Sequence, residues 1–474
     1  MTPRPIAGLV ALALAGVTLV GCIDLAPPDR RLAAPVPATL PNGGADPAAV
    51  ARPIGAWRDF FADGRLAAVI DLALVNNRDL RVAVANVAAA RGIYGVQRAN
   101  LFPKLGATAS AVYGQTPTSV ASAGASGGSG VHNERLYQVN AGVSAWQLDL
   151  FGKVRDSARA ALDTYFASQA ARDAAQVTLV GEVAADWLTL GADRSLLAIA
   201  RDTQASGEAT VALLKARFEA GVASGLDVAQ AQTALQQALY DVARLTTQVA
   251  RDRNALDLVV GAPVAEGLLP ANIDAGDAVL ADLPSGLPSS VLLARPDVVR
   301  AEDLLKAANA NVGAARAAFF PSIALTGSGG VTSLALSTLL RAASESWTFA
   351  PTLTQPIFDF GANRGNLAYA KAQKDAALAT YEKAIQTAFR EVSDALALRG
   401  TIDEQLAAQK ALVDAADHAY RLSDARYQRG ADTWLNALIA QRTLYAARQS
   451  VVNIRLARAT NLVTLYTTLG GGLR

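Results

Sequence analysis

The sequence predicts a mixed α and β membrane protein with an internal two-fold repeat, in which long helices accompany a few short strands. Three observations predict this class. The 474-residue chain is 51% hydrophobic but only 6% aromatic, and its abundant alanine favours helices that approach one another closely. Motifs recur at constant spacing in the two halves of the chain. Two segments in each half alternate apolar and small polar residues, as membrane strands do.

The composition excludes several kinds of functional site. A single cysteine cannot form an internal disulfide or a cysteine-based metal cluster. Two histidines leave little material for a zinc site or a histidine-centred triad. The 43 basic and 41 acidic residues give a net charge of +2, which is no signal for nucleic acid. We therefore expect a protein that is not an enzyme, with no catalytic residues, no metal site, no cofactor and no nucleic-acid partner.

The N-terminal residues predict an export signal at residues 1–21. Arg4 supplies the positive start, and an apolar stretch too short to span a membrane follows it. This stretch runs into Leu19-Val20-Gly21-Cys22, which resembles the lipobox of bacterial lipoproteins. We therefore expect Cys22 to be the acylated first residue of the mature chain. The alternative is an ordinary secretory signal with a chance cysteine.

Residues 22–56 are predicted to form the lipid anchor and a Pro-rich tether. Their Pro, Ala and Gly content disfavours a helix, and an extended tether and plain disorder fit the composition equally well. Ile23 follows the cysteine directly, and an Asp comes one residue later. Because an Asp directly after the cysteine resembles an inner-membrane retention mark, this order favours sorting to the outer membrane.

The chain contains two copies of one unit. The pairs separated by 218 positions are Asp79 with Asp297 and Phe102 with Phe320, and those separated by 209 are Phe151 with Phe360, Gly221 with Gly430, and Gly261 with Gly470. The change in spacing places nine extra residues of the first copy between Pro103 and Phe151. We therefore predict repeat 1 at residues 57–269, a linker at 270–288 and repeat 2 at 289–474.

Each repeat is predicted to hold a helix, two strands and two long helices. In repeat 1 these span residues 66–100, 104–115, 135–148, 154–219 and 226–260. In repeat 2 they span residues 289–318, 322–331, 346–358, 363–428 and 435–469. A Phe-Pro pair ends the first helix of each repeat, because proline disfavours helix at the residue before it. Helices above about 25 residues suggest a coiled coil or a helical repeat.

The strand segments alternate with a period of two. Trp347, Phe349 and Leu353 alternate with the small polar Thr348 and Thr352. The pattern is typical of strands in an outer-membrane barrel, although a half-buried soluble hairpin gives the same period. Four strands cannot close a barrel, because the smallest membrane barrels have about eight. Strands of two, three or four chains would be needed to avoid open edges in lipid.

In order and in duplication, these motifs resemble the outer membrane factors of Gram-negative efflux systems, the TolC-like family, and most closely its lipoprotein branch of OprM and NodT type. The matching residues are Cys22, Trp57, Asp59-Phe60-Phe61, Asn77-Arg78-Asp79-Leu80, Leu101-Phe102-Pro103, Trp146 to Gly152, Arg295-Pro296-Asp297, Phe319-Phe320-Pro321, Gln355-Pro356-Ile357-Phe358, Tyr427 to Gly430 and Leu469-Gly470-Gly471-Gly472.

The resemblance implies an architecture and a set of partners. The fold would be a homotrimer in which a 12-stranded transmembrane β-barrel continues into a long periplasmic α-helical barrel, with an equatorial collar that includes residues 270–288. The partners would be a periplasmic adaptor (a membrane fusion protein), an inner-membrane pump of RND type and outer-membrane lipid. The location would be the bacterial outer membrane, with a lipid anchor and a large periplasmic part.

The resemblance also implies a gate at the two helix–helix turns, at Gly221 and Gly430. Asp227 and Tyr427 match the aspartate and tyrosine that form a hydrogen-bonded latch in the family. Leu435 matches a hydrophobic constriction. Here the sequence departs from the family, because Asn436 and Ile439 stand where acidic residues commonly form an anionic ring. Asp227 and Asp432 remain as anions near the tip, so we expect weaker block by trivalent cations than in a relative that has the ring.

The predicted function is the outer-membrane channel of a tripartite efflux pump, which exports drugs or other toxic small molecules and is opened at its periplasmic tip by the adaptor. The alternative is the outer-membrane conduit of a type I protein secretion or metal efflux system. A periplasmic adaptor lipoprotein would show one helical hairpin beside globular β-domains. A lipid-anchored enzyme would need a catalytic constellation, and the sequence has none.

Overall fold

A computed structural model describes residues 24–28, 34–41, 57–117, 131–273 and 288–472. The chain divides into two compact units, and each unit combines segments from both halves of the sequence. Unit 1 comprises Met1–Leu32, Ala88–Ala167 and Glu302–Thr380, and unit 2 comprises Ala33–Val87, Ser168–Ala301 and Tyr381–Arg474. The predicted signal peptide at 1–21, Cys22 and most of the predicted linker at 270–288 lie outside the described residues.

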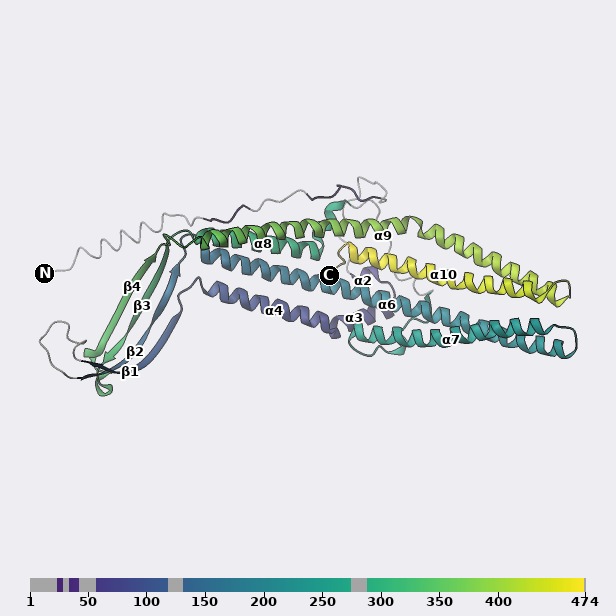
Figure 1. Ribbon diagram of the computed structural model, residues 1–474, viewed down its shortest axis with the longest axis horizontal. Coiled ribbons are helices and arrows are strands. Elements are labelled where there is room, and N and C mark those ends of the chain that lie inside the picture. Colours follow the sequence, from purple (N-terminus) through teal and green to yellow (C-terminus); the bar gives the residue numbers. More distant parts are fainter. Residues whose placement is uncertain (1–23, 29–33, 42–56, 118–130, 274–287, 473–474) are drawn as a thin grey trace. The chain divides into compact units, whose positions relative to one another are not determined.

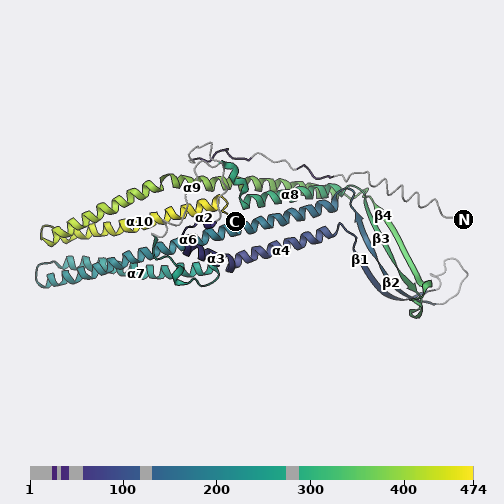
Figure 2. The same cartoon turned by 180° about the vertical axis from the view of Figure 1, so that it is seen from behind.

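Unit 1 contains a four-stranded antiparallel sheet with the strand order β1-β2-β3-β4 (Figures 1 and 2). The strands are β1 (Leu105–Pro117), β2 (Val131–Leu148), β3 (Ser322–Ser333) and β4 (Glu345–Thr354). Among the described residues, no strand pairs with the outer edge of β1 or of β4. The prediction of a mixed α and β protein is therefore confirmed, and β4 ends four residues before the predicted Phe358.

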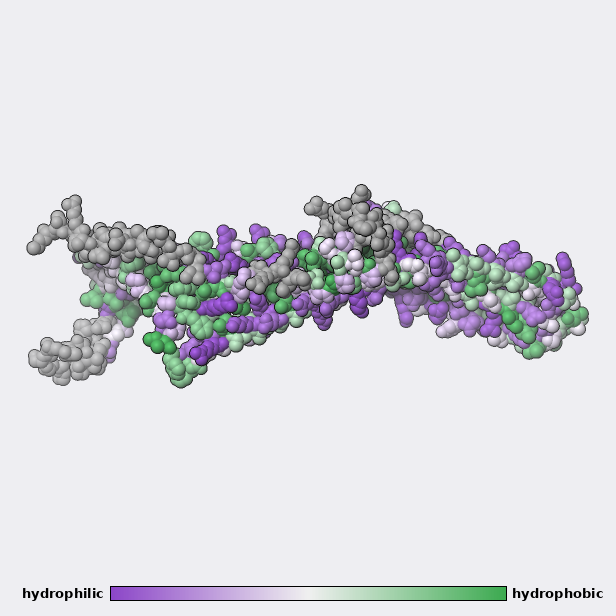
Figure 3. Space-filling view, turned by 90° about the horizontal axis from the view of Figure 1, so that it is seen from above, coloured by the Kyte–Doolittle hydropathy of each residue, from purple (hydrophilic) through white to green (hydrophobic). Residues whose placement is uncertain are grey.

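The register gathers most of the apolar residues of the four strands on one face of the sheet. Ala109 lies opposite Val139, Val139 opposite Val331, and Ile323 opposite Leu353. Small and polar residues occupy the other face, as in the pairs Thr108 with Asn140, Asn140 with Gly330, and Ala324 with Thr352. The apolar face is uncovered within one chain, since Trp347, Phe349 and Leu353 are all more than 60% exposed. Figure 3 shows apolar side chains at the surface over the strands.

Four long helices form two hairpins. The first hairpin is α6 (Lys153–Glu219) with α7 (Gly225–Val260), and the second is α9 (Ala362–Gln428) with α10 (Trp434–Thr468). In both ribbon views the helices of each hairpin run side by side. All four begin and end within one residue of the predicted bounds. Both α6 and α9 have 67 residues and contribute to both units.

The predicted helix at 66–100 is wrong in one respect, because it is broken at Asn77 into α3 (Gly64–Asn76) and α4 (Arg78–Ala99). Asn77 has an extended backbone, and its side-chain oxygen accepts from the backbone N–H of Leu80, as an N-cap does. Its amide donates to the carbonyl of Val259 in α7. Asn77 is buried, so this break is a built junction between α3, α4 and α7.

The predicted helix at 289–318 is also two elements. Residues Ser289–Ala294 form the 3₁₀ helix η3, and α8 spans Pro296–Ala317. Arg295 between them is extended because a proline follows it, and proline suits the first position of a helix. The buried Arg295 guanidinium pairs with Asp297 and Glu391 and donates to the carbonyl of Thr468. The junction is therefore held by charge pairs within unit 2.

The core of unit 2 gathers most of the bulky buried side chains. The short helix α2 (Trp57–Phe60) supplies Trp57 and Phe60, and Phe60 stacks on Tyr466 with 4.8 Å between ring centroids. Trp187 is fully buried and donates to the carbonyl of Leu268 in the 3₁₀ helix η1 (Glu266–Leu268). In unit 1 the interface of α6 with α8 is alanine-rich, with Ala160, Ala307 and Ala310 in one cluster.

The described parts of the predicted tether have partners in the fold. The backbone N–H of Ser289 donates to the carbonyl of Ala38, and Thr39 forms a β-bridge with Pro288. Residues 24–28 lie against α6 and α8. The described parts of this segment are therefore held in place. Among the described residues, no helix is both long enough and apolar enough to cross a membrane.

Candidate functional site

The two hairpin turns are built around glycines, as the sequence predicts. Gly221 and Gly430 have φ values of 74° and 71°, the left-handed region that glycine adopts without strain. In each turn the glycine N–H and the next N–H return to the end of the preceding helix, as in the Schellman motif. The acceptors in the first turn are the carbonyls of Phe218 and Arg217, and in the second those of Tyr427 and Arg426.

Asp227 and Tyr427 do not form the predicted latch in this structure. The Asp227 carboxylate accepts from the hydroxyl and the N–H of Ser224, at 2.6 and 3.1 Å, and completes a capping box at the start of α7. Tyr427 instead lies under the Arg217 guanidinium, 5.0 Å from its ring centroid, and packs edge-on against Trp434. The latch that the resemblance implies is absent here because Asp227 stands three residues after a serine, where a local cap competes with a tertiary bond.

Trp434 joins the second hairpin to the first. Its side chain is 6% exposed and packs in one apolar cluster with Val211 and Leu214 of α6 and Ala231 of α7. The indole N–H is buried and finds no acceptor among the described residues. This contact is therefore held by apolar burial alone. Sequence reasoning missed Trp434, although a tryptophan directly after a turn, where the other repeat has Gly225, was an available signal.

The residues that follow Trp434 leave an apolar pair uncovered. Leu435 and Ile439 are 44% and 54% exposed and stand four positions apart, so they share a face of α10. Asn436 beside them is exposed and donates to the Asp432 carboxylate at 2.7 Å. Asp432 also pairs with Arg426, and these bonds, the one from Asn436 foremost, lower the pKa of the Asp432 carboxyl. Asp432 is thus an anion already paired within its own turn.

Polar bonds further along the helices join the two hairpins. The Tyr445 hydroxyl of α10 donates to the Asp241 carboxylate of α7 at 3.2 Å, and Asp241 is buried. Gln441 of α10 donates to the hydroxyl of Ser206 in α6. Burial and the charge of Asp241 raise the pKa of Tyr445 to about 12, so the phenol stays a donor. The sequence places Tyr445 on the apolar stripe of its helix, where a buried hydroxyl requires an acceptor.

A cavity of about 520 Å³ lies beside this bond. Helix α6 contributes Thr203, while α7 and α10 contribute most of the lining, which includes Gln230, Gln237, Asp241, Arg442 and Tyr445. The side-chain oxygen of Gln230 is buried without a donor among the described residues. The two hairpins are therefore packed closely at Trp434 and loosely further along, where polar groups remain between them.

Comparisons with known proteins agree with this geometry. The family model described as outer membrane efflux protein matches residues 69–262 and 287–471. The toluene efflux pump outer membrane protein TtgC of Pseudomonas putida is 44% identical over 469 residues, which cover 98% of this chain and 95% of TtgC. The outer membrane protein OprJ of Pseudomonas aeruginosa is 40% identical over 469 residues, which cover 99% and 96% of the two chains.

Solved structures show the same fold. A membrane protein from Pseudomonas aeruginosa matches with a TM-score of 0.85 and 38% identity, over 95% of this chain and 98% of its own. The Neisseria gonorrhoeae MtrE outer membrane channel, solved in its open state, matches with a TM-score of 0.83 and 37% identity, over 95% and 99% of the two chains. The chain therefore belongs to the outer membrane efflux protein family.

Proposed function

We propose that this protein is the outer-membrane channel of a tripartite efflux pump and exports drugs or other toxic small molecules. Its partners are a periplasmic adaptor and an inner-membrane pump of RND type. Family membership supports a channel role, and relatives at 41–44% identity over nearly the whole chain carry efflux names. Most residues on the polar face of the sheet are small and uncharged and offer little selectivity, so the pump chooses the cargo.

The sheet is the observation that carries the proposal. One face is apolar and uncovered, the other is small and polar, and both edges are free among the described residues. Free edges are costly in lipid, so other copies must pair with β1 and β4. Three copies of the four-stranded sheet make a closed barrel of twelve strands. The exposed Val82, Val84, Ile93 and Val96 of α4 supply further apolar surface for neighbouring copies.

The gate of the channel is assigned to the hairpin turns. Three copies of Leu435 and Ile439 bring apolar side chains together at the tip and form a constriction that excludes water. Trp434 holds the two hairpins of each chain together, and the adaptor opens the tip by separating them. Separation exposes the indole N–H to water, which offsets part of the cost of uncovering the ring. With Ile439 and Asn436 in place of acidic residues, trivalent cations block the channel weakly.

The mature chain is anchored by acylation of Cys22. The lipobox-like residues 19–22 support this assignment, and the internal repeat is supported by the two separate stretches that match the family model. Labelled palmitate is expected on the wild-type protein and not on Cys22→Ala.

A complementation experiment tests the export function. The gene is expressed in a Gram-negative strain that lacks its own outer-membrane efflux component but retains the matching adaptor and pump. Restored resistance to pump substrates, together with recovery of the protein in the outer-membrane fraction, is the expected result. A correctly localised protein that restores no resistance with any of several adaptor–pump pairs would contradict the proposal.

A further inference from the structure

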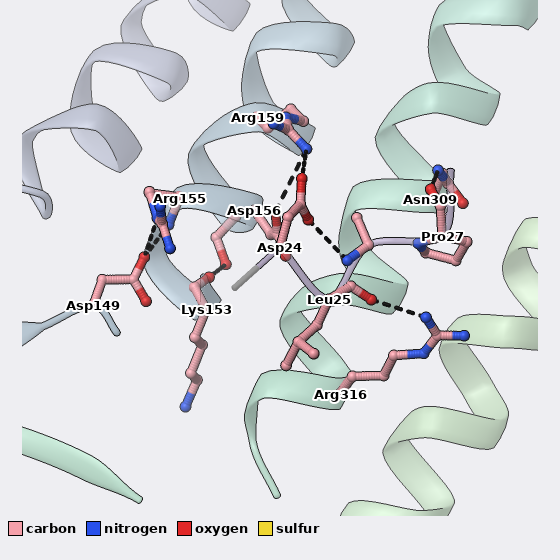
Figure 4. Close-up of polar contacts among 12 residues, drawn as sticks. Asp24, Leu25, Pro27, Asp149, Lys153, Arg155, Asp156, Arg159, Asn309 and Arg316 are labelled. Atoms are coloured by element: carbon pink, nitrogen blue, oxygen red, sulfur yellow. Dashed lines mark hydrogen bonds and ion pairs between the residues drawn. The ribbon is translucent and has the colours of Figure 1, made fainter. Parts of the chain in front are cut away.

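Residues 24–28, which begin two positions after the predicted acylation site, occupy a defined place on unit 1. Asp24 carries two hydrogen bonds on its carboxylate (Figure 4). One comes from Arg159 of α6 at 3.0 Å, and the other comes from the backbone N–H of Ala26 at 2.9 Å. These bonds lower the pKa of the Asp24 carboxyl, the bond from Ala26 most. Asp24 is thus an anion that binds both the backbone of its own turn and Arg159 of α6.

The backbone of the same segment is bound by α8. The carbonyl of Leu25 accepts from the Arg316 guanidinium at 2.9 Å, and the carbonyl of Pro27 accepts from the Asn309 amide at 2.6 Å. Asn309 is only 5% exposed, so its amide is positioned by the fold. If the tether moved freely, the Asn309 amide and the Arg316 guanidinium would be hydrated. Here both groups donate hydrogen bonds to the backbone of the segment, as the side chains of a binding site do.

Gly313 of α8 permits the close approach of the segment. A Cβ atom on Gly313 would lie 2.9 Å from both the Cα and the backbone nitrogen of Ala26, and would overlap Oδ2 of Asp156. Contacts this short with backbone atoms force one of the two chain segments to move. We call Arg159, Asn309, Gly313 and Arg316 the N-terminal clasp.

Asp156 places a second carboxyl group at the clasp. It is 3% exposed, and its Oδ2 atom accepts no hydrogen bond from the described residues. Burial first, and then the negative charge of Asp24, raise the pKa of the Asp156 carboxyl to about 6. The groups that face it are Asp24 of the segment, Asp149 before α6, Arg155 and Arg159 of α6, and the uncharged Gly313 of α8.

We propose that α6 and α8 form a dedicated receptor for residues 24–28, which holds the acylated end of the mature chain beside the first turns of α6. The acyl anchor in this statement rests on the proposed function. Asp24 lies two positions after Cys22, a reach of at most about 7 Å. Helix α6 begins five residues after the end of β2, so the receptor fixes the anchor at the level where the strands leave the membrane.

The mobility of a nitroxide attached to the thiol of a Pro28→Cys variant tests the receptor. Pro28 is exposed, so this substitution leaves the clasp contacts in place. In the mature protein in nanodiscs, the spectrum is expected to show an immobilised label. Gly313→Ala is expected to abolish the immobilised component, while Gly92→Ala in α4, where a Cβ meets nothing within 4 Å, retains it. Equal immobilisation in both variants would overturn the proposal.

A second variant covers the case in which Gly313→Ala fails to fold. Asp24→Ala changes only the bound segment, removes both acceptor bonds, and is expected to mobilise the label in a protein with wild-type thermal stability. If the label stays immobilised in Asp24→Ala, the segment is not held by the clasp.

The pH dependence supplies an independent readout. A carboxyl whose pKa is raised in the docked state favours docking when it is protonated, so docking weakens as the pH rises from about 4 to about 6 and then levels off. The full effect is at most on the order of 100-fold in the docking equilibrium. Asp156→Asn is expected to remove this dependence between pH 4.5 and pH 7.5 and to immobilise the label more strongly at pH 7.5. A wild-type curve unchanged by Asp156→Asn would contradict the role of this carboxyl.

The number of labels per chain separates this proposal from that of acylation. An acylated Cys22 has no free thiol, so the mature Pro28→Cys protein takes up one nitroxide. Two nitroxides would show that Cys22 is unmodified and would contradict the anchor. In that case the receptor is tested in a protein that carries Cys22→Ala together with Pro28→Cys, so that the only label is at position 28. Adding Gly313→Ala to this protein would still be expected to abolish the immobilised component.

Discussion

At the scale of single residues, Tyr445 and Asp241 form the polar bond between α10 and α7. Asp241 is 9% exposed, so Tyr445→Phe leaves a buried carboxylate with one donor fewer. A hydrogen bond to a charged group contributes about 1.5–3 kcal/mol. We expect the variant to loosen the two hairpins and to spend more time in high-conductance states in planar bilayers.

Tyr240→Phe is the matched control, since Tyr240 lies one position before Asp241 on α7 and is 62% exposed. It removes the same atom from a side chain that faces away from the bond. A resting conductance of Tyr445→Phe equal to that of Tyr240→Phe and of the wild type would show that this bond does not hold the tip.

Asp193 of α6 and Asp252 of α7 give unit 2 a pH-dependent stability. Burial first, and then a hydrogen bond and repulsion from Asp252, raise the pKa of Asp193 to about 7. A carboxyl with a raised pKa stabilises the fold when protonated, and this contribution is lost as the pH rises from about 4 to about 7. Asp193→Asn is therefore expected to raise the melting temperature at pH 8 and to have little effect near pH 4.

The exposed Asp202 on the same helix provides the control for this prediction. Asp202→Asn removes one charge from α6 without changing a buried pair. Melting curves recorded from pH 4 to pH 8 should separate the two variants only in the upper half of the range. If the melting temperatures of Asp193→Asn and Asp202→Asn changed in the same way with pH, the raised pKa of Asp193 would not be the source of the pH dependence.

Residue roles at the turns could be predicted from sequence only where local chemistry decides them. Gly221 and Gly430 were identifiable because a helix–helix turn needs a left-handed residue. The pairing of Asp227 with Tyr427 was not decidable, because Asp241 of α7 and Tyr445 of α10 offer a second aspartate–tyrosine pair between the two hairpins. Which tyrosine reaches which aspartate depends on the packing of the two hairpins, and sequence periodicity does not specify that packing.

At the scale of elements, the two faces of the sheet lead us to expect opposite effects of the same substitution at neighbouring residues of β4. Phe349 lies on the apolar face of β4, and Thr348 lies on the small polar face. An arginine on the lipid side costs about 2–4 kcal/mol near the middle of the membrane, whereas a lumen position tolerates charge. Phe349→Arg is expected to reduce the amount of protein in the outer-membrane fraction, and Thr348→Arg to leave it unchanged.

Both variants add the same side chain to the same strand, so general effects of arginine on expression cancel. If Thr348→Arg were lost from the membrane and Phe349→Arg retained, the assignment of the two faces would be reversed. Equal loss of both variants would show that β4 is not a lipid-facing strand.

The strands and long helices were predictable because their periods and glycine or proline ends are local. The breaks at Asn77 and Arg295 were missed. Asn77 caps α4 with one side-chain atom and reaches Val259 with another, 182 positions away. Arg295 depends in the same way on Glu391 and Thr468. An N-capping asparagine and a proline mark the two breaks locally, but the distant partners that hold Asn77 and Arg295 leave no signal in the same sequence window.

At the scale of the whole molecule, the compact units do not follow the predicted repeats. Unit 1 takes β1 and β2 from the first half of the chain and β3 and β4 from the second. The 218- and 209-residue spacings show which segments correspond. They do not show that the strands of the two copies join into one sheet, which requires the β2–β3 ladder seen here. The repeat remains a prediction about how the sequence arose.

The number of chains in the assembly is the last prediction. Two, three or four copies of a four-stranded sheet give even-numbered closed barrels, so strand arithmetic alone does not choose among them. The family resemblance favours three. Co-expression of a long-tagged and an untagged chain, followed by native gel electrophoresis of the detergent-solubilised protein, is expected to give four species, because a trimer can hold from zero to three tagged copies. A dimer would give three species and a tetramer five. Phe349→Arg serves as the control, since a chain that fails to insert gives only monomer bands.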